Sequence, residues 1–263
     1  MKLIRHKVEK PWGRTDLPDG GGRRIGEIWF EAPDGRALPL LVKHIFTSEK
    51  LSIQVHPNDA QARARGLPNG KSECWYILQA EPDAVLGLGF KEEIGKAEMR
   101  QAALDGSIES LMDWKPVRAG DFFTVPAGTV HAIGAGLSLI EVQQQSDTTY
   151  RLYDYGRPRE LHLEDGVDVA EGGVYPDGCA SHVDGSEQRV LVKGPHFTLL
   201  YVGDESADAL VDQQRWVIPL FGTVTCGDEE GQPGDCLFIE PDREIAGDGA
   251  FLLASSSRSE PAP

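Results

Sequence analysis

Several polar residues stand at spacings that could build a metal site inside a β structure. In an extended strand, residues i and i+2 face the same side. Three such pairs occur in runs that have the pattern of strands: Gln54 with His56, Lys71 with Glu73, and Glu141 with Gln143. If these strands line one barrel, their polar faces could converge on its interior. Buried polar groups must be paired or liganded, and a metal ion is one such partner.

A second histidine stands in a recognisable turn pattern. The segment Gly120–His131 fits G-x5-P-x-G-x2-H, which is typical of a strand, a Pro/Gly turn and a return strand that aims its histidine inward. Two imidazoles, one carboxylate and one amide oxygen suit a divalent metal with open positions. The predicted metal ligands are Gln54, His56, Glu73 and His131. Since the set lacks cysteine, it indicates a catalytic rather than a structural metal.

The elements that must position these residues are mostly strands. Alternating or apolar runs predict strands at 38–45, 51–56, 73–78, 121–125 and 137–145, and 146–159 is expected to be an ordered loop. The best helical stretch is Lys91–Met112, which is charged, rich in alanine and free of proline; Gly106 should break it into two short helices. Shorter helical pieces are expected at 60–65 and within 161–173.

A faint internal repeat predicts a second β unit. Gly120–Pro126 resembles Gly234–Pro241, which is one residue longer, but a histidine follows only the first proline at the matching distance. Coincidence between two strand-ending turns is the alternative. We therefore expect a metal-binding domain over 1–165, a second, degenerate β domain over 175–254, and a disordered tail over 255–263.

Charge and composition exclude several classes of protein. The 263 residues carry a formal charge of −16, and the sequence pI near 4.8 argues against a nucleic-acid binder. No run approaches the ~18 apolar residues of a membrane span, and no signal peptide begins the sequence. The four cysteines form no C-x-x-C pair. These features predict a cytoplasmic protein with reduced thiols.

The pattern at Gly120–His131 is the second motif of the cupin superfamily, and four segments together narrow the resemblance. The sequence closely resembles the type I mannose-6-phosphate isomerases, in particular their short bacterial members. The segments that carry it occur in order: LSIQVHPND at 51–59, GKSECWYIL at 70–78, PAGTVHAI at 126–133 and EVQQQSDTTYRLYDYGR at 141–157. The resemblance covers roughly residues 1–165 and is weak beyond them.

The resemblance implies an all-β cupin fold, a double-stranded β-helix or jelly-roll barrel, with a small helical insertion near 91–112. It implies one zinc ion per chain, held by Gln54, His56, Glu73 and His131. It also implies a cytoplasmic aldose–ketose isomerase that interconverts mannose 6-phosphate and fructose 6-phosphate. The sequence departs from the family at two places: Gln54-x-His56 replaces the usual His-x-His of cupins, and GEIW at 26–29 replaces GESW.

The resemblance matches Lys71 and Arg151 to active-site positions, and the chemistry suggests their roles. Isomerisation moves a proton between C1 and C2 through an enediol. Lys71 is the candidate acid/base group, whereas Arg151 could stabilise the developing negative charge or clamp the phosphate. Lys43 and Glu141 are expected to contact the substrate, Lys43 at its phosphate. For Arg151, a structural pair with Asp147 or Asp154 is the alternative.

Two other functions remain open for the sequence. One is another metal-dependent cupin enzyme, such as an iron-dependent dioxygenase, which the absence of His-x-His disfavours. The other is a non-catalytic cupin that binds a sugar phosphate, which the presence of every matched site residue disfavours. The predicted partner is a small sugar phosphate, with no nucleic acid and no membrane, and the chain could be a monomer or a homodimer.

Overall fold

The structure is a computed structural model that describes residues 1–184, 187–203 and 210–257. Its strands form four antiparallel sheets, which confirms the predicted all-β class. The seven-stranded sheet has the order β1 (Ile4–Arg14), β2 (Ile25–Glu31), β3 (Leu40–Phe46), β10 (Leu137–Gln144), β5 (Glu73–Ala80), β8 (Asp121–Val125) and β12 (Ala180–His182). A five-stranded sheet faces it, with the order β11 (Tyr150–Tyr153), β4 (Ile53–Val55), β9 (His131–Ile133), β6 (Val85–Phe90) and β7 (Met112–Pro116).

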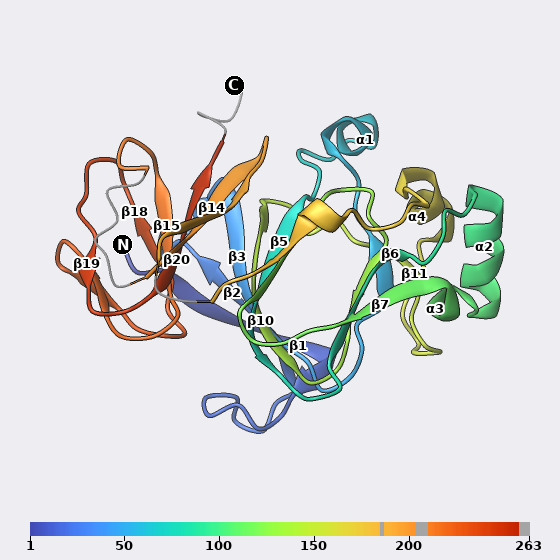
Figure 1. Cartoon of the computed structure of the whole chain (residues 1–263), viewed down its shortest axis with the longest axis horizontal. Helices are drawn as coiled ribbons and strands as arrows, with labels where there is room; N and C mark the ends of the chain where they lie inside the picture. Colours follow the sequence, from blue (N-terminus) through green and yellow to red (C-terminus); the bar gives the residue numbers. More distant parts are fainter. Residues whose placement is uncertain (185–186, 204–209, 258–263) are drawn as a thin grey trace.

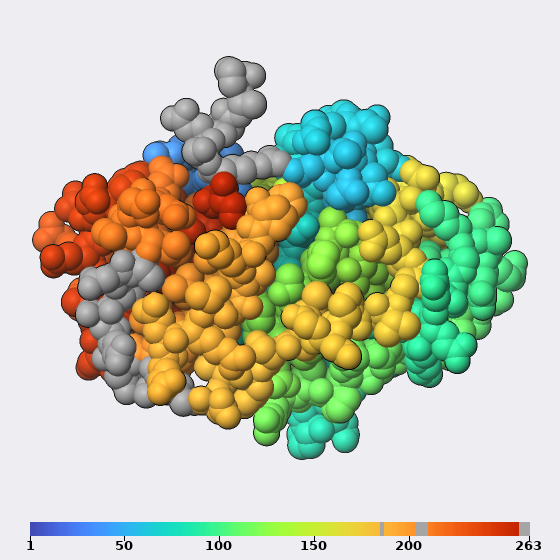
Figure 2. Space-filling view, turned by 45° about the horizontal axis from the view of Figure 1, so that its top comes forward, coloured from blue at the N-terminus to red at the C-terminus, as the bar shows by residue number. Residues whose placement is uncertain are grey.

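The later part of the chain forms the other two sheets. One has the order β13 (Arg189–Lys193), β14 (Phe197–Val202), β20 (Phe251–Ser256), β15 (Arg215–Pro219) and β18 (Leu237–Ile239). The other has the order β17 (Glu229–Gly231), β16 (Val224–Cys226) and β19 (Ala246–Gly247). In Figures 1 and 2 these orange and red sheets form one end of the molecule, and the green helices α2 and α3 lie at the opposite end.

The seven-stranded sheet packs on both of its faces. Successive side chains of a strand point to opposite faces, and both faces of this sheet carry apolar residues. Toward the five-stranded sheet it presents Trp75, Ile77 and Leu139, which share a core with Leu86 and Leu88 of β6. Toward the C-terminal sheet it presents a second apolar set that packs with residues of β15 and β20. This second core includes Ile28, Phe30, Val42, Val142, Trp216, Ile218, Leu252 and Ala254.

The helices are α1 (Asp59–Ala64), α2 (Lys96–Asp105), α3 (Ile108–Leu111) and α4 (Leu163–Val169), and a short 3₁₀ turn spans Asp177–Cys179. Of these, α2, α3 and α4 cover the outer face of the five-stranded sheet, and α1 lies apart from them (Figure 1). The predicted break at Gly106 is confirmed: this residue ends α2 in a left-handed conformation with φ of 82°. None of the helices in the described part of the chain is long and apolar enough to cross a membrane.

Two local expectations were wrong. The segment 146–159 is not all loop, because Tyr150–Tyr153 forms β11 and pairs with β4 at the edge of the five-stranded sheet. The expected tail does not begin at 255, because β20 continues to Ser256, where Ser255 is buried. Residues 258–263 of that tail lie outside the described residues. The division into two domains stays a prediction.

Candidate metal centre and the adjoining cavity

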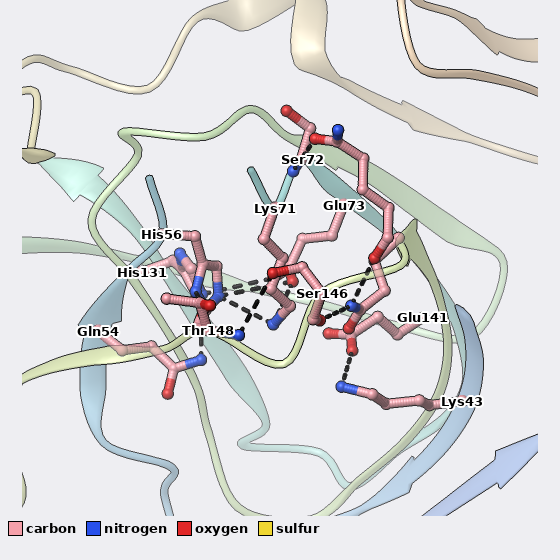
Figure 3. Close-up of polar contacts among 12 residues, drawn as sticks. Lys43, Gln54, His56, Lys71, Ser72, Glu73, His131, Glu141, Ser146 and Thr148 are labelled. Atoms are coloured by element: carbon pink, nitrogen blue, oxygen red, sulfur yellow. Dashed lines mark hydrogen bonds and ion pairs between the residues drawn. The ribbon is translucent and has the colours of Figure 1, made fainter. Parts of the chain in front are cut away.

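Three of the four predicted metal ligands meet inside the barrel. His56 directly follows β4, Glu73 begins β5 and His131 begins β9. One ligand atom from each lies within 4.8 Å of the others, and all three residues are 1% exposed. Figure 3 shows the two imidazoles side by side, facing the carboxylate. The sheets thus bring together residues that are far apart in sequence.

Both histidines are held in the form that a metal requires. The Nδ1 atom of His56 lies 2.8 Å from the carbonyl oxygen of Thr148, and that of His131 lies 2.9 Å from the carbonyl oxygen of Thr129. A carbonyl can only accept, so each Nδ1 carries the proton and donates it. Each Nε2 is then the unprotonated nitrogen, with its lone pair directed into the site, as is usual for histidines that bind metals.

The carboxylate of Glu73 lacks the hydrogen bonds that such deep burial normally demands. Within the described residues Oε1 accepts no hydrogen bond, and Oε2 has only the Lys71 ammonium as a partner. The nearest groups are the Lys71 ammonium, 2.8 Å from Oε2, and His131 Nε2, 3.4 Å from Oε1. A divalent cation bound by this carboxylate and the two Nε2 lone pairs would satisfy all three. The donor set therefore fits a metal.

Gln54 lies beside the cluster but does not present its oxygen to it. Gln54 is the cross-strand partner of His131. Its Nε2 lies 3.3 Å from His131 Nε2, and its Oε1 accepts a hydrogen bond from the Ser52 hydroxyl at 3.0 Å. To bind a metal as the sequence predicts, the Gln54 amide would have to turn over and exchange its two ends. Its role as a ligand stays a prediction.

Burial sets the charge state of the cluster. It lowers the pKa of His131 to about 4, and it lowers the pKa of His56 well below its usual value, with the Lys71 charge adding to the effect. Burial also raises the pKa of Glu73 to about 7, with the negative charge of Glu141 adding to the rise and Lys71 opposing it. Both imidazoles are therefore neutral near pH 7, which is the form that binds metal.

A cavity of about 290 Å³ adjoins the cluster, close to the lower end of the range for ligand pockets. His56, Glu73 and His131 lie behind its wall, where Lys71 and Gln54 separate them from the open space. The cavity is lined by Lys10, Trp12, Glu27, Lys43, Ile45, Leu51, Ser52, Gln54, Lys71, Ile133, Glu141, Asp147, Thr149, Arg151, Arg159 and His162. All four predicted catalytic and substrate-binding residues are among them.

Lys43 and Glu141 form a buried ion pair in this wall. They are cross-strand partners on β3 and β10, and their charged atoms lie 2.9 Å apart with both side chains 4% exposed. The Trp75 indole donates to the second oxygen of Glu141 at 3.1 Å. Burial alone would raise the pKa of Glu141, but the ammonium groups of Lys43 and Lys71 outweigh it and lower the pKa to about 2.

The segment that carries Lys71 and Glu73 is fixed by a polar network around Asp59. One oxygen of Asp59 accepts from the backbone N–H of Gly70 and from the amide of Gln144, both at 2.9 Å. The other end of the Gln144 amide accepts from the backbone N–H of Ser72 at 2.9 Å. The space is tight, because a Cβ at Gly70 would lie 2.5 Å from the backbone of Asn58. Lys71 and Glu73 are thus held from both sides.

Sequence reasoning missed three basic residues in the cavity wall, namely Lys10, Arg159 and His162. Arg159 pairs with both oxygens of the buried Asp154, at 2.6 and 2.7 Å. His162 stands at the start of α4. The concentration of Arg151, Arg157 and Arg159 within nine residues was the signal available. The alternative in which Arg151 pairs with Asp147 or Asp154 is not observed among the described residues, where its guanidinium makes no ion pair.

Curated relatives and solved structures both relate the chain to mannose-6-phosphate isomerases. No family model matches the chain. It is 42% identical over 169 residues to the mannose-6-phosphate isomerase of Streptococcus mutans, covering 61% of this chain and 53% of that protein. It is 34% identical over 223 residues to a putative mannose-6-phosphate isomerase of Bacillus subtilis, covering 78% of this chain and 70% of that protein. The alignment with the first relative thus spans only about half of that relative's length.

Solved structures extend the likeness to nearly the whole chain. The mannose 6-phosphate isomerase from Bacillus subtilis superposes with a TM-score of 0.81 at 27% identity, covering 96% of this chain and 98% of that one. A putative mannosephosphate isomerase from Archaeoglobus fulgidus has a TM-score of 0.78 at 17% identity, which shows the fold alone. This likeness confirms the predicted cupin-type fold and includes the C-terminal sheets that the sequence motifs did not reach.

The metal centre predicts how the protein responds to metal removal. Added Zn²⁺ should raise the free energy of unfolding, by about 2.7 kcal/mol when free metal is 100 times its Kd, because it binds only the folded site. Chelation should reverse the gain. Glu73→Gln removes the central carboxylate at constant size and should abolish the shift. Denaturant unfolding with and without Zn²⁺ measures this, with His6→Gln on the surface as the control. An undiminished shift in Glu73→Gln would place the metal elsewhere.

The Lys43–Glu141 pair predicts a strongly non-additive double mutant. Glu141→Gln or Lys43→Met alone leaves one buried charge uncompensated and should lower the free energy of unfolding by about 3 kcal/mol. The double variant should lose clearly less than the sum. The pKa of Glu141 is lowered from its usual 4.5 to about 2, so its contribution is present above pH 4.5 and lost as the pH falls toward 2. Glu141→Gln should lack this part of the acid sensitivity. Additive single effects would contradict a coupled pair.

Proposed function

Because the chain belongs to the mannose-6-phosphate isomerase family, we propose that it is a metal-dependent aldose–ketose isomerase that interconverts mannose 6-phosphate and fructose 6-phosphate through an enediol. The motif resemblance of the sequence is thereby confirmed at the level of the family. The observation that carries the proposal is the buried cluster of His56, Glu73 and His131 directly behind a cavity lined by lysine and arginine.

The proposed cofactor is one Zn²⁺ per chain, held by Gln54, His56, Glu73 and His131. Zinc bound there would act as a Lewis acid, or as a template, for the sugar's O1 and O2. Histidine nitrogens with a carboxylate and no cysteine are typical of catalytic zinc sites. The neutral imidazoles and the unsatisfied carboxylate support this assignment.

We propose that Lys71 moves the proton between C1 and C2. Its ammonium lies where the cavity meets the metal cluster, 2.8 Å from Glu73 Oε2 and 3.0 Å from His56 Nε2. The side chain is 4% exposed, so its position is set by these contacts. Fixing the acid/base group next to the sugar carbons is what general acid–base catalysis requires.

Charges in the rest of the cavity suit an anionic substrate. Arg151 has no ion pair within the described residues, so its guanidinium is available to stabilise the enediolate or to clamp the phosphate. Lys43 and Glu141 are proposed to contact the substrate, Lys43 through its phosphate and Glu141 through a hydroxyl. A net charge of −16 does not oppose this, because residues 1–165 hold 21 basic and 24 acidic residues and are nearly balanced.

The remaining properties follow the family and are proposals for this chain. We propose a cytoplasmic enzyme, monomeric or homodimeric, whose partner is the sugar phosphate and not a nucleic acid or a membrane. Its catalytic domain would comprise residues 1–165, with a second, degenerate β domain over 175–254. The acidic excess of the later region would favour solubility.

The decisive experiment is a coupled isomerase assay on purified protein loaded with Zn²⁺. Mannose 6-phosphate should be converted, whereas glucose 6-phosphate and unphosphorylated mannose should react at least about 100-fold more slowly, because the first has the opposite configuration at C2 and the second lacks the phosphate. Chelation should abolish turnover and Zn²⁺ should restore it. Tight binding of mannose 6-phosphate without turnover would favour a binding protein, and oxygen uptake would favour a dioxygenase; either would overturn the proposal.

The role of Lys71 has its own test. Lys71→Ala should lower the exchange of the C2 proton of mannose 6-phosphate into solvent by at least about 100-fold, as expected for loss of a general acid/base. Proton NMR in ²H₂O measures this exchange directly. Lys115→Ala, a partly exposed lysine that does not line the cavity, is the matched control and should exchange at the wild-type rate. Wild-type exchange in Lys71→Ala would remove Lys71 from the mechanism.

A further inference from the structure

We propose that His162 is a positioning residue that fixes Arg151 in the wall of the cavity. This inference rests on the proposed function, in which Arg151 is the cation that meets the substrate. His162 is separated from Arg151 by eleven positions in the sequence, and both residues line the cavity. Two hydrogen bonds join them, and both use backbone groups of Arg151.

The first part of the argument is the geometry of these two bonds. The backbone N–H of His162 donates to the carbonyl oxygen of Arg151 at 2.8 Å. The backbone N–H of Arg151 donates to Nδ1 of the His162 ring at 3.3 Å. One residue therefore satisfies both the donor and the acceptor of the Arg151 backbone. The backbone N–H and the ring of His162 thus take the place of the backbone groups that a neighbouring strand would offer to Arg151.

The second part is that β11 has no strand on that side. In the five-stranded sheet β11 is an edge strand, and its only partner is β4. Arg151 is opposite Gln54 in that pairing. Backbone groups of alternate residues in a strand point to opposite sides, and those of Arg151 point away from β4, to His162. Without His162, this short edge strand would leave them unpaired next to the cavity.

The third part is that nothing else holds the Arg151 side chain. Among the described residues its guanidinium makes no hydrogen bond and no ion pair. Arg159, its neighbour in the wall, differs: it pairs with both oxygens of Asp154. The place of the Arg159 guanidinium is thus set by a side-chain partner. Arg151 is held through its backbone instead, by β4 and by His162.

The ring of His162 is itself fixed in one tautomer and one position. Since Nδ1 accepts the Arg151 N–H, the ring proton is on Nε2. The ring centroid lies 6.1 Å from that of Tyr150, at an interplanar angle of 52°. Nε2 lies 4.0 Å from the exposed carboxylate of Glu160, the only ion-pair contact found for this ring within the described segments. His162 also stands directly before α4, so a helix anchors its backbone.

The test separates the acceptor at Nδ1 from the bulk of the ring. His162→Phe keeps an aromatic ring beside Tyr150 and keeps the backbone N–H, but it cannot accept from Arg151. His162→Asn is smaller, yet its Oδ1 can accept in place of Nδ1. We expect His162→Phe to lower kcat/KM for mannose 6-phosphate by about 10-fold or more, as a misplaced catalytic group does. His162→Asn should stay within about threefold of the wild type.

A double-mutant cycle with Arg151→Ala shows whether His162 acts through Arg151. In the Arg151→Ala background, His162→Phe should change kcat/KM by less than about twofold, because the group it positions is gone. Zinc content and the midpoint of thermal unfolding should match the wild type in each variant. An equal loss in both backgrounds would overturn the inference, because it would mean that His162 acts on its own or through general stability.

A readout independent of turnover keeps this inference distinct from the proposed function. Amide hydrogen exchange at Arg151 should speed up at least about 10-fold in His162→Phe but not in His162→Asn, while the amides of β5 and β10 stay protected. Unchanged Arg151 exchange in His162→Phe would overturn the inference even if the enzyme is active. If the wild type does not isomerise mannose 6-phosphate, the proposed function fails, and faster Arg151 exchange in His162→Phe would still support the positioning by His162.

Discussion

Burial of the Glu73 carboxylate is the constraint on which the rest of the site depends. A carboxylate that is almost fully removed from water must find positive partners or accept a proton. At Glu73 the protein supplies Lys71 at 2.8 Å and two neutral imidazoles whose lone pairs face the same point. It leaves Oε1 without a hydrogen bond and gives Oε2 only the Lys71 ammonium. Such a group is poorly satisfied by protein alone, and a divalent cation completes it.

The same constraint explains why the buried charges around the site come in pairs of opposite sign. Lys43 pairs with Glu141 as Lys71 pairs with Glu73. The negative charge of Glu141 raises the pKa of Glu73, and both lysines lower the pKa of each carboxylate, so no member of this set is independent of the others. A site with this organisation can receive an anionic sugar without ever exposing an isolated buried charge.

Strict alternation made much of this site predictable. In β5 and β10 every second residue faces the barrel interior, and Glu73 and Glu141 fall on that face beside apolar residues such as Trp75 and Leu139, so both could be assigned to one interior from sequence. The Pro/Gly turn before β9 likewise indicated His131. Alternation could not predict β11, because four residues at a sheet edge are too short to show a period. Arg159 and His162 were missed because they lie outside the strands, so no alternation shows which way their side chains face.

The two-sided packing of the seven-stranded sheet has a consequence for the acidic part of the chain. Val42 and Val142 belong to the core shared with the C-terminal sheet, while their neighbours Lys43 and Glu141 line the cavity. Because each valine is bonded directly to a cavity-lining residue, a change in the packing of the C-terminal sheet would shift the wall of the cavity directly. The acidic C-terminal region therefore packs directly behind the strands that carry the cavity-lining Lys43 and Glu141.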